Sequence, residues 1–192
     1  MSRNCIKTNL PYINIKQLLI LLLYLSFLDT SAQSWSLGGG AVYGDDIENI
    51  GIHFRGYYNL PNNKVCFGPE YSNFFEKSET ENGEETNKSL NEINFNIHYI
   101  IEISEHWGLY PLTGANLSFE KEEIEIDLIK QSEDTSKFGV NLGFGIHRQV
   151  GNMVLFAEYD HLFGNLSQNS FLLGVFVIFG EGIDSSHRET TY

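Results

Sequence analysis

The fold of this protein is indicated most clearly by one stretch, Phe138-Gly139-Val140-Asn141-Leu142-Gly143-Phe144-Gly145-Ile146-His147. Every second residue in it is large and apolar, and the residues between are small or polar. A helix turns about 100° per residue and would spread the apolar side chains around its whole surface, whereas a strand places them on one face. The stretch is therefore predicted to be a β-strand with one apolar face.

The same period of two runs through the chain on both sides of this stretch. Asn91–Glu102 alternates with a single irregularity at Ile100, and Gly51–Leu60 alternates as well. No convincing amphipathic helix follows the N-terminal region. The pattern predicts an all-β protein with eight strands, which lie near residues 34–44, 49–60, 64–76, 90–103, 107–120, 136–149, 154–163 and 170–179.

The connections between these strands alternate in length. Three are short, at Asn62-Asn63, Ser104–His106 and Gly151-Asn152, and two are long and mostly charged, at Lys77–Ser89 and Lys121–Thr135. In an up-and-down arrangement all the short turns fall on one side of the sheet and both long connections, expected as loops, fall on the other. Bacterial outer-membrane barrels show this asymmetry, with short periplasmic turns and long extracellular loops. Within the second long connection Glu123–Leu128 alternates again, which predicts that the fifth strand continues above the membrane as a projecting hairpin. Its residues Ile124, Ile126 and Leu128 are expected to pack on the neighbouring strand, and pairing with a partner strand is the alternative.

Alternation alone leaves open which face points outward, because a soluble lipocalin-like barrel turns its apolar side inward. Here the polar face is rich in glycine and poor in charge, which suits a crowded lumen better than a solvated exterior. Aromatic residues of the apolar face gather near the strand ends, as in the girdles that meet the two lipid interfaces. The predicted girdle residues are Trp35, Tyr43, Tyr58, Phe75, Trp107, Phe119, Phe138, Phe163, Phe171 and Phe179. The predicted fold is an eight-stranded antiparallel up-and-down transmembrane β-barrel.

Three segments of the chain resemble the small eight-stranded outer-membrane β-barrel domain family, related in shape to the OmpX and OmpA barrels. They are Val140–Gly145, Phe156–Asp160 and the final strand Phe171–Phe179, which ends on an aromatic residue with alternate apolar positions. The resemblance covers essentially all of the chain after the N-terminal region. It implies an integral outer-membrane protein in contact with membrane lipid and lipopolysaccharide, inserted by the barrel assembly machinery. The sequence departs from the family pattern at its end, because residues 180–192 follow the final strand, which usually ends the chain in this family.

The N-terminus has the features of a secretory signal peptide. Basic residues precede the apolar run Leu18–Leu28, and the small residues Thr30 and Ala32 fit a cleavage site after Ala32. A run of this length is too short for a membrane-spanning helix, which needs about 20 apolar residues. We expect a signal peptide at residues 1–32, a barrel at 33–180 and a short periplasmic tail at 181–192.

Composition excludes several other classes of protein. Eighteen glycines beside four prolines and two cysteines do not fit a collagen-like, disulfide-rich or Cys-rich zinc protein. The formal charge of −13 leaves little to neutralise phosphates, so no nucleic-acid partner is expected. The carboxylates of the two long connections are interpreted as solvating the surface and repelling neighbours, and binding of divalent cations beside lipopolysaccharide is the alternative. They lack the EF-hand spacing, and no metal or cofactor site is predicted.

The lumen of an eight-stranded barrel is just wide enough to be filled by side chains, so a wide channel is not expected. Charged and polar groups that alternation turns inward should form a network, because burying them unpaired is costly. This lumen network is predicted to contain His53, Arg55, Glu70, Glu92, Glu102, His98, His147, Glu158 and Asp160. Two-residue turns at Asn62-Asn63 and Gly151-Asn152 predict that Arg55 lies opposite Glu70, and Glu158 opposite Gly145 with His147 in diagonal reach. A rigidifying plug of ion pairs is favoured over a proton or ion pathway.

No motif predicts an enzyme. Glu158 and Asp160 resemble a carboxylate pair, but the narrow lumen leaves no sugar site. A lipid-modifying acyl hydrolase remains an alternative, with His161 near the outer rim and Ser167 and Ser170 close along the chain. The predicted function is that of a monomeric, non-enzymatic outer-membrane barrel with a structural or surface-interacting role. A second alternative is an accessory barrel of an envelope or secretion complex.

Overall fold

The computed structural model describes residues 34–61, 64–81, 84–126 and 129–180. The predicted signal peptide, the predicted tail and the Asn62-Asn63 turn lie outside these residues. Among the described residues, no helix is long and apolar enough to cross a membrane.

All regular secondary structure of the described residues is β-strand. The strands are β1 (Ser34–Gly44), β2 (Asn49–Asn59), β3 (Val65–Glu81), β4 (Glu84–Tyr99), β5 (Ile101–Glu102), β6 (Trp107–Ile126), β7 (Ile129–Val150), β8 (Met153–Gly164) and β9 (Gln168–Gly180). Only Ile100, the residue that interrupts the alternation in the sequence, separates β4 from β5, and both pair with β6. Counted as one, they leave eight barrel strands among the described residues, as predicted.

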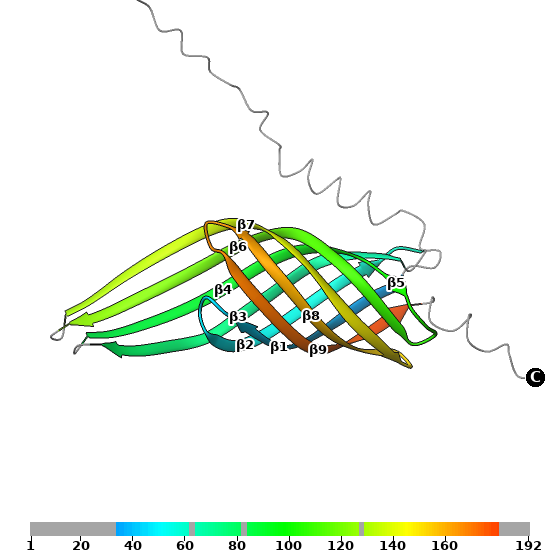
Figure 1. Ribbon diagram of the computed structural model, residues 1–192, viewed down its shortest axis with the longest axis horizontal. Coiled ribbons are helices and arrows are strands. Elements are labelled where there is room, and N and C mark those ends of the chain that lie inside the picture. The colour runs from blue at the N-terminus through cyan, green and yellow to red at the C-terminus, as the bar shows by residue number, and fades with distance from the viewer. Residues whose placement is uncertain (1–33, 62–63, 82–83, 127–128, 181–192) are drawn as a thin grey trace, which may run out of the picture. The chain divides into compact units, whose positions relative to one another are not determined.

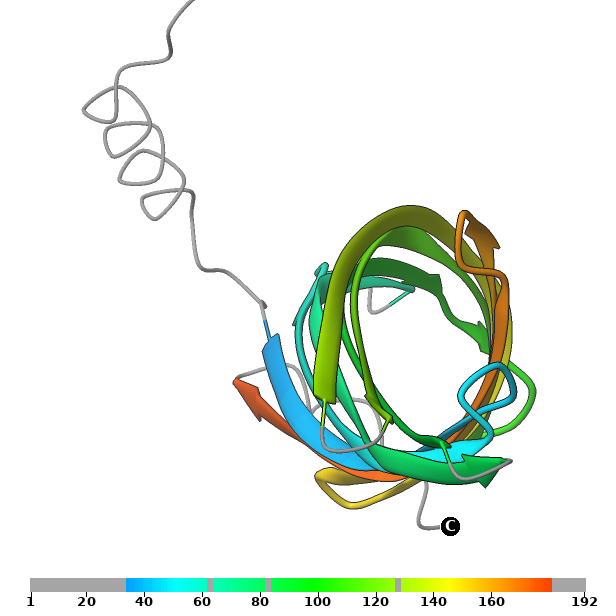
Figure 2. The same cartoon turned by 90° about the vertical axis from the view of Figure 1, so that its left-hand side faces the viewer.

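The strands close into an antiparallel barrel (Figures 1 and 2). β1 pairs with β9 from Ser34 opposite Gly180 to Gly44 opposite Ser170, and β4 pairs with β6, so the sheet returns on itself. Closure removes the exposed edges that an open sheet of this kind would present. The ladders place Arg55 opposite Glu70 and Glu158 opposite Gly145, the two register pairs that the turns predicted.

The outer face of the barrel is apolar. Its exposed side chains include Leu37, Phe54, Phe95, Leu142 and Phe144, the last two 55% and 63% exposed. Such a continuous apolar surface around a closed sheet suits hydrocarbon rather than water. Nine of the ten predicted girdle residues are also exposed on it; Tyr58 is half-buried because its ring packs edge-on against Trp35 at 4.9 Å.

The two long connections are strands among the described residues, so the expectation of loops is wrong for most of their length. The predicted continuation of the fifth strand as a projecting hairpin is confirmed as far as Ile126. β3 and β4 stay paired as far as Glu81 opposite Glu84, and β6 and β7 stay paired as far as Ile126 opposite Ile129. β4 stays paired with β6 as far as Glu85 opposite Glu125, so β3, β4, β6 and β7 leave the barrel as one sheet (Figure 1). We call this the projecting sheet: residues 76–81, 84–88, 120–126 and 129–137. Its many charged residues are typical of loops when read in the sequence. In the structure lysines and glutamates lie opposite one another on neighbouring strands, as in Lys88 opposite Glu122.

The lumen is closed by apolar side chains at the end from which the projecting sheet extends, the long-hairpin end. Val42, Phe74, Leu90 and Leu172 stand on the inward face near the strand ends, and Leu166 folds in from the β8–β9 connection. With Ile47, Phe156 and Leu162 they form a buried cluster that we call the apolar plug. The plug is an apolar exception on a face that was predicted to be polar and glycine-rich.

Candidate functional site: the lumen and its open mouth

Arg55 is the centre of the lumen network. Its guanidinium is buried and donates two hydrogen bonds to Glu158, from Nη2 to Oε1 at 2.8 Å and from Nη1 to Oε2 at 3.0 Å. The bond crosses the lumen from β2 to β8, between residues 103 positions apart in the sequence. Glu70, the register neighbour predicted as its direct partner, lies farther from Nη2, at 3.9 Å. The Arg55 guanidinium also lies over the Phe156 ring, 4.0 Å from its centre.

Glu70 finds other partners on the near wall. It accepts a hydrogen bond from the Tyr57 hydroxyl, and His53 Nε2 and His98 Nε2 lie 3.5 and 3.7 Å from its oxygens. Arg55 Nε donates to His53 Nε2 at 3.0 Å, so this nitrogen carries no proton. His53 therefore has its proton on Nδ1, 2.9 Å from the Ser72 hydroxyl. Polar groups from β2 and β4, the two neighbours of β3, thus surround the buried carboxylate.

Four aromatic rings continue the network along one side of the lumen. Tyr110 donates to Glu158 Oε2 at 2.9 Å, and its ring stacks on His98 with centroids 4.8 Å apart and planes within 7°. His147 lies on the other side of Tyr110 at 5.8 Å, and Tyr57 meets His98 edge-on at 4.7 Å. We call these four residues the ring wall.

The ring wall depends on Gly145. A Cβ atom built there would lie 2.3 Å from Cζ of Tyr110 and 2.4 Å from its hydroxyl. Real Cβ atoms do not approach so closely, and the clash is with the ring that bonds Glu158. Glycine at this position therefore lets Tyr110 lie flat against β7.

A second network, of amides, joins β4, β6 and β7. Asn116 donates to Asn94 at 2.7 Å, and Asn141 donates to Asn94 at 2.9 Å and to Asn96 at 3.1 Å. The Ser118 hydroxyl donates to Asn116 Oδ1 at 2.7 Å. This amide network was not predicted, although its asparagines stand on the polar face of the predicted strands, where the alternation could have identified them.

The remaining predicted lumen residues lie in different surroundings. Glu92 and Asp160 are buried, and Glu92 accepts a hydrogen bond from Gln168 at 3.2 Å. His147 is half-buried, and Glu102 is exposed on β5, away from the Arg55 centre. The structure thus brings His53, Arg55, Glu70, His98 and Glu158 together and leaves Glu102 at the rim.

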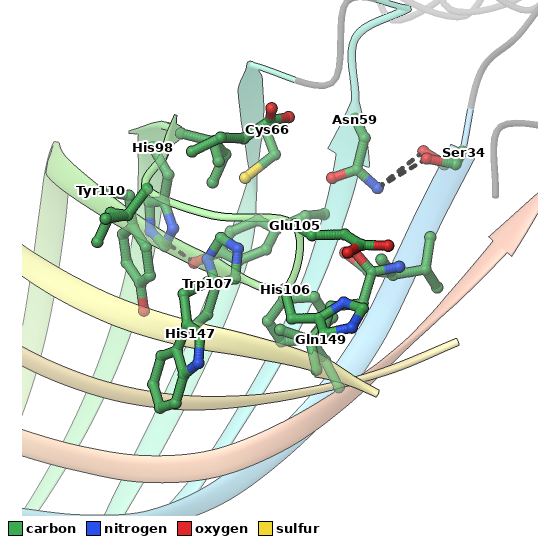
Figure 3. Close-up of a pocket in the computed structure, with 18 of the residues that line it drawn as sticks. Ser34, Asn59, Cys66, His98, Glu105, His106, Trp107, Tyr110, His147 and Gln149 are labelled. Atoms are coloured by element: carbon green, nitrogen blue, oxygen red, sulfur yellow. Dashed lines mark hydrogen bonds between the residues drawn. The ribbon is translucent and has the colours of Figure 1, made fainter. Parts of the chain in front are cut away.

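A cavity of about 650 Å³ opens at the end opposite the apolar plug, where the connection at 103–106 and the Gly151-Asn152 turn lie (Figure 3). We call it the mouth cavity. Its inner wall carries Arg55, its sides carry the ring wall, and its rim carries Glu102, Glu105 and His106. Cys66, the lone cysteine of the described residues, is buried beside it. The lumen is thus accessible from one end and filled by the ion-pair network and the apolar plug toward the other.

Comparison with known families agrees with this architecture. Residues 18–179 match the outer membrane protein beta-barrel domain family. The chain belongs to this family. A search of curated protein sequences finds no significant match.

Solved outer-membrane barrels share the fold of this family member. The N-terminal β-barrel domain of Pseudomonas aeruginosa OprF is 14% identical with a TM-score of 0.58, over 76% of this chain and 97% of that one. A major outer membrane protein from Thermus thermophilus is 14% identical with a TM-score of 0.57, over 77% of this chain and all of that one. Ail, the attachment invasion locus protein of Yersinia pestis, is 19% identical with a TM-score of 0.50, over 77% and 96%. These likenesses show the shared fold, and the family assignment supports an integral location in the outer membrane.

His161 and Ser170, two of the three residues suggested for an acyl hydrolase, do not lie together in this outer-membrane barrel. Ser170 is buried on the inward face opposite Asp160, whereas His161 lies on the other face, opposite Asn169. His161 Nδ1 is 2.8 Å from Asn169 Oδ1, which also accepts a hydrogen bond from the Tyr159 hydroxyl. These contacts favour a structural role for His161 at the membrane rim.

The projecting sheet of the outer-membrane barrel is strongly charged. The segments 76–88 and 120–137 contain twelve carboxylates and five lysines. Lys137 lies 2.5 Å from Glu120 on the neighbouring strand. Hydrogen bonds to Glu48 and Glu79 raise the pKa of Lys77 to about 12, so Lys77 stays charged. The carboxylates still outnumber the lysines, and the sheet is a negative surface.

Replacing Gly145 by Ala should lower the free energy of unfolding of the outer-membrane barrel by about 1–3 kcal/mol, the usual cost of overpacking. The added methyl group displaces the Tyr110 ring and breaks its bond to Glu158. Urea unfolding in detergent, followed by tryptophan fluorescence, measures the loss. Gly56→Ala is the matched control, because its Cβ would meet only the flexible end of Leu37, at 3.1 Å. An equal effect of the two variants would contradict the role of Gly145.

Proposed function

We propose that this chain is a monomeric, non-enzymatic outer-membrane barrel that displays the projecting sheet outside the cell, where it binds an extended segment of a partner. In this orientation the mouth cavity faces the periplasm. The signal peptide at residues 1–32 would export the chain, the barrel assembly machinery would insert it, and lipid and lipopolysaccharide would surround it. The lumen network and the apolar plug support a stabilising role for the interior rather than transport.

The observation that carries this proposal is the pair of unfilled edges on the projecting sheet. Among the residues that the structure describes, β7 pairs only with β6 between residues 129 and 138, and β3 pairs only with β4 between residues 75 and 81. A bulge between Phe74 and Lys77 marks where β3 departs from β2. The Asn49 side-chain amide donates to the backbone carbonyls of Phe75 and Glu76 within this bulge. Free backbone donors and acceptors along an edge can take up a partner strand.

Charge favours a basic partner. The excess of carboxylates on the projecting sheet attracts lysine and arginine and repels acidic segments. The same charges hinder pairing between copies of this chain, because like charges would then face each other. An extended basic segment added beside β7 fits both the free edge and the charge, and supports the monomeric state.

Two single-cysteine variants test this proposal, each in a Cys66→Ser background. The first variant is Ser132→Cys, at an exposed position on the free edge of β7. The second is Asn152→Cys, at an exposed position at the opposite end of the barrel. On intact cells, a membrane-impermeant maleimide should label Ser132→Cys fully and Asn152→Cys only after the outer membrane is opened. The reverse pattern would contradict the orientation.

The same variants, purified in detergent, test binding at the edge. An extended peptide of alternating lysine and valine should slow labelling of Ser132→Cys several-fold and leave labelling of Asn152→Cys unchanged. A glutamate–valine peptide should protect neither position. Equal protection by both peptides, or none by the lysine peptide, would contradict the proposed partner chemistry.

A further inference from the structure

The mouth cavity has no part in the proposed surface interaction, yet it has the properties of a ligand site. Its volume of about 650 Å³ lies within the range of about 300–1,000 Å³ that small-molecule sites occupy. It opens at the exposed turn 103–106, so a solute can enter from solvent. Polar side chains line it and can orient a ligand, and apolar side chains line it and can cover the ligand's apolar surface.

The charge around the cavity is unbalanced. Arg55 is the lone Lys or Arg side chain among the described residues that line it, and both its terminal nitrogens already bond Glu158. Glu102 and Glu105 stand at the rim, both exposed. The two rim carboxylates attract cations toward the cavity and repel anions.

The walls provide two further elements of recognition. Tyr57, His98, Tyr110 and His147 of the ring wall line one side, and aromatic rings attract organic cations. On the opposite side, Val154, Phe176 and Ile178 offer an apolar surface. A ligand with a charged nitrogen and a flat or apolar body would match both sides.

One buried polar atom lacks a partner inside the cavity wall. Ser36 lines the cavity and is only 2% exposed, and its hydroxyl makes no hydrogen bond within the structure. Buried hydroxyls are normally hydrogen-bonded, so an unpartnered one marks a position that a ligand can satisfy. This observation is independent of the charge and of the rings.

We propose that the mouth cavity is a binding site for a small organic cation, an amine or a quaternary nitrogen compound with a flat apolar body. The cationic nitrogen lies toward Glu102, Glu105 and the ring wall, and the body rests against Val154, Phe176 and Ile178. The Ser36 hydroxyl bonds a polar group of the ligand. The Arg55–Glu158 pair forms the floor and remains intact.

Three probes with one ring and different charges test the site: 1-methylnicotinamide as the cation, nicotinamide as the neutral compound and nicotinate as the anion. Trp107 lies at the cavity, and in the Trp35→Phe variant it is the only tryptophan of the chain. In a maltoside detergent, 1-methylnicotinamide should quench Trp107 saturably, with a Kd about tenfold below that of nicotinamide. Nicotinate should bind more weakly than both. Non-saturable quenching by the cation, or equal affinity for all three probes, would overturn the proposal.

Rim variants separate a specific site from general attraction to an acidic protein. Glu102→Gln combined with Glu105→Gln should weaken binding of 1-methylnicotinamide about five- to tenfold and leave that of nicotinamide unchanged. The matched control, Glu79→Gln with Glu122→Gln, removes two charges from the projecting sheet and should change neither affinity. His147→Leu, which removes one ring, should also weaken cation binding. An equal loss of affinity for 1-methylnicotinamide in the rim pair and the control pair would overturn the site. Electrophoretic mobility on detergent gels before and after boiling verifies that each variant is folded.

Discussion

Replacement of Arg55 by Met should lower the free energy of unfolding by about 3–5 kcal/mol, the range measured when one partner of a buried ion pair is removed. The substitution leaves the Glu158 carboxylate buried without the two donors at 2.8 and 3.0 Å. It also removes the donor to His53 Nε2 and a guanidinium charge 3.9 Å from Glu70. Urea unfolding in detergent or lipid, with the shift in electrophoretic mobility on boiling as a second readout, measures the effect.

A double variant identifies the cause of this loss. Arg55→Met with Glu158→Leu removes both charges, and a buried pair replaced by apolar groups of similar size is often close to neutral. The double variant should therefore recover most of the stability that Arg55→Met loses. The exposed pair Lys88 and Glu122, 3.9 Å apart, is the control, and Lys88→Met there should cost less than about 1 kcal/mol. An Arg55→Met protein as stable as the parent would contradict the network.

Replacement of Leu142 by Arg should cost about 2–4 kcal/mol of folding stability in a lipid bilayer, the cost of arginine on the lipid face near the midplane of a barrel. Leu142 is exposed on the outer face, between the girdle residue Phe138 and the opposite end of β7. If that face contacts hydrocarbon, the guanidinium must leave water for lipid. Folding into vesicles across a urea series measures the cost.

Depth supplies the control for this prediction. Phe138→Arg introduces the same charge four residues away, at the girdle, where the cost should fall to about 1 kcal/mol or less beyond the loss of the ring. If the outer face met water instead of hydrocarbon, both positions would be solvated and both variants would be tolerated. Equal and small effects would therefore contradict the membrane orientation of the sheet.

Local pattern was sufficient to predict the barrel strands and their inward and outward faces. The alternation in Phe138–His147 sets which side chains share a face, because a strand places every second residue on the same side. Short turns have few geometries, so the Gly151-Asn152 turn predicted that Glu158 lies opposite Gly145. Even the irregularity at Ile100 corresponds to the break between β4 and β5.

The projecting sheet was only partly predictable, through the alternation in Glu123–Leu128. Charged residues such as Lys121 and Glu122 are common in loops, and local sequence does not reveal that a neighbouring strand supplies opposite charges. The pairing of β4 with β6 stabilises these segments, and it joins parts of the chain more than 30 residues apart, such as Thr86 and Ile124.

The sequence by itself determined the period of two, the glycine-lined inner face and the aromatic ends, because these depend on geometry within one strand or one hairpin. Only the tertiary structure decided that Arg55 bonds Glu158 rather than Glu70, that Tyr110 lies on Gly145, and that one end of the lumen is plugged while the other is open. The physical reason is closure of the barrel, which brings side chains of distant strands across the lumen, where their length and orientation select the partner.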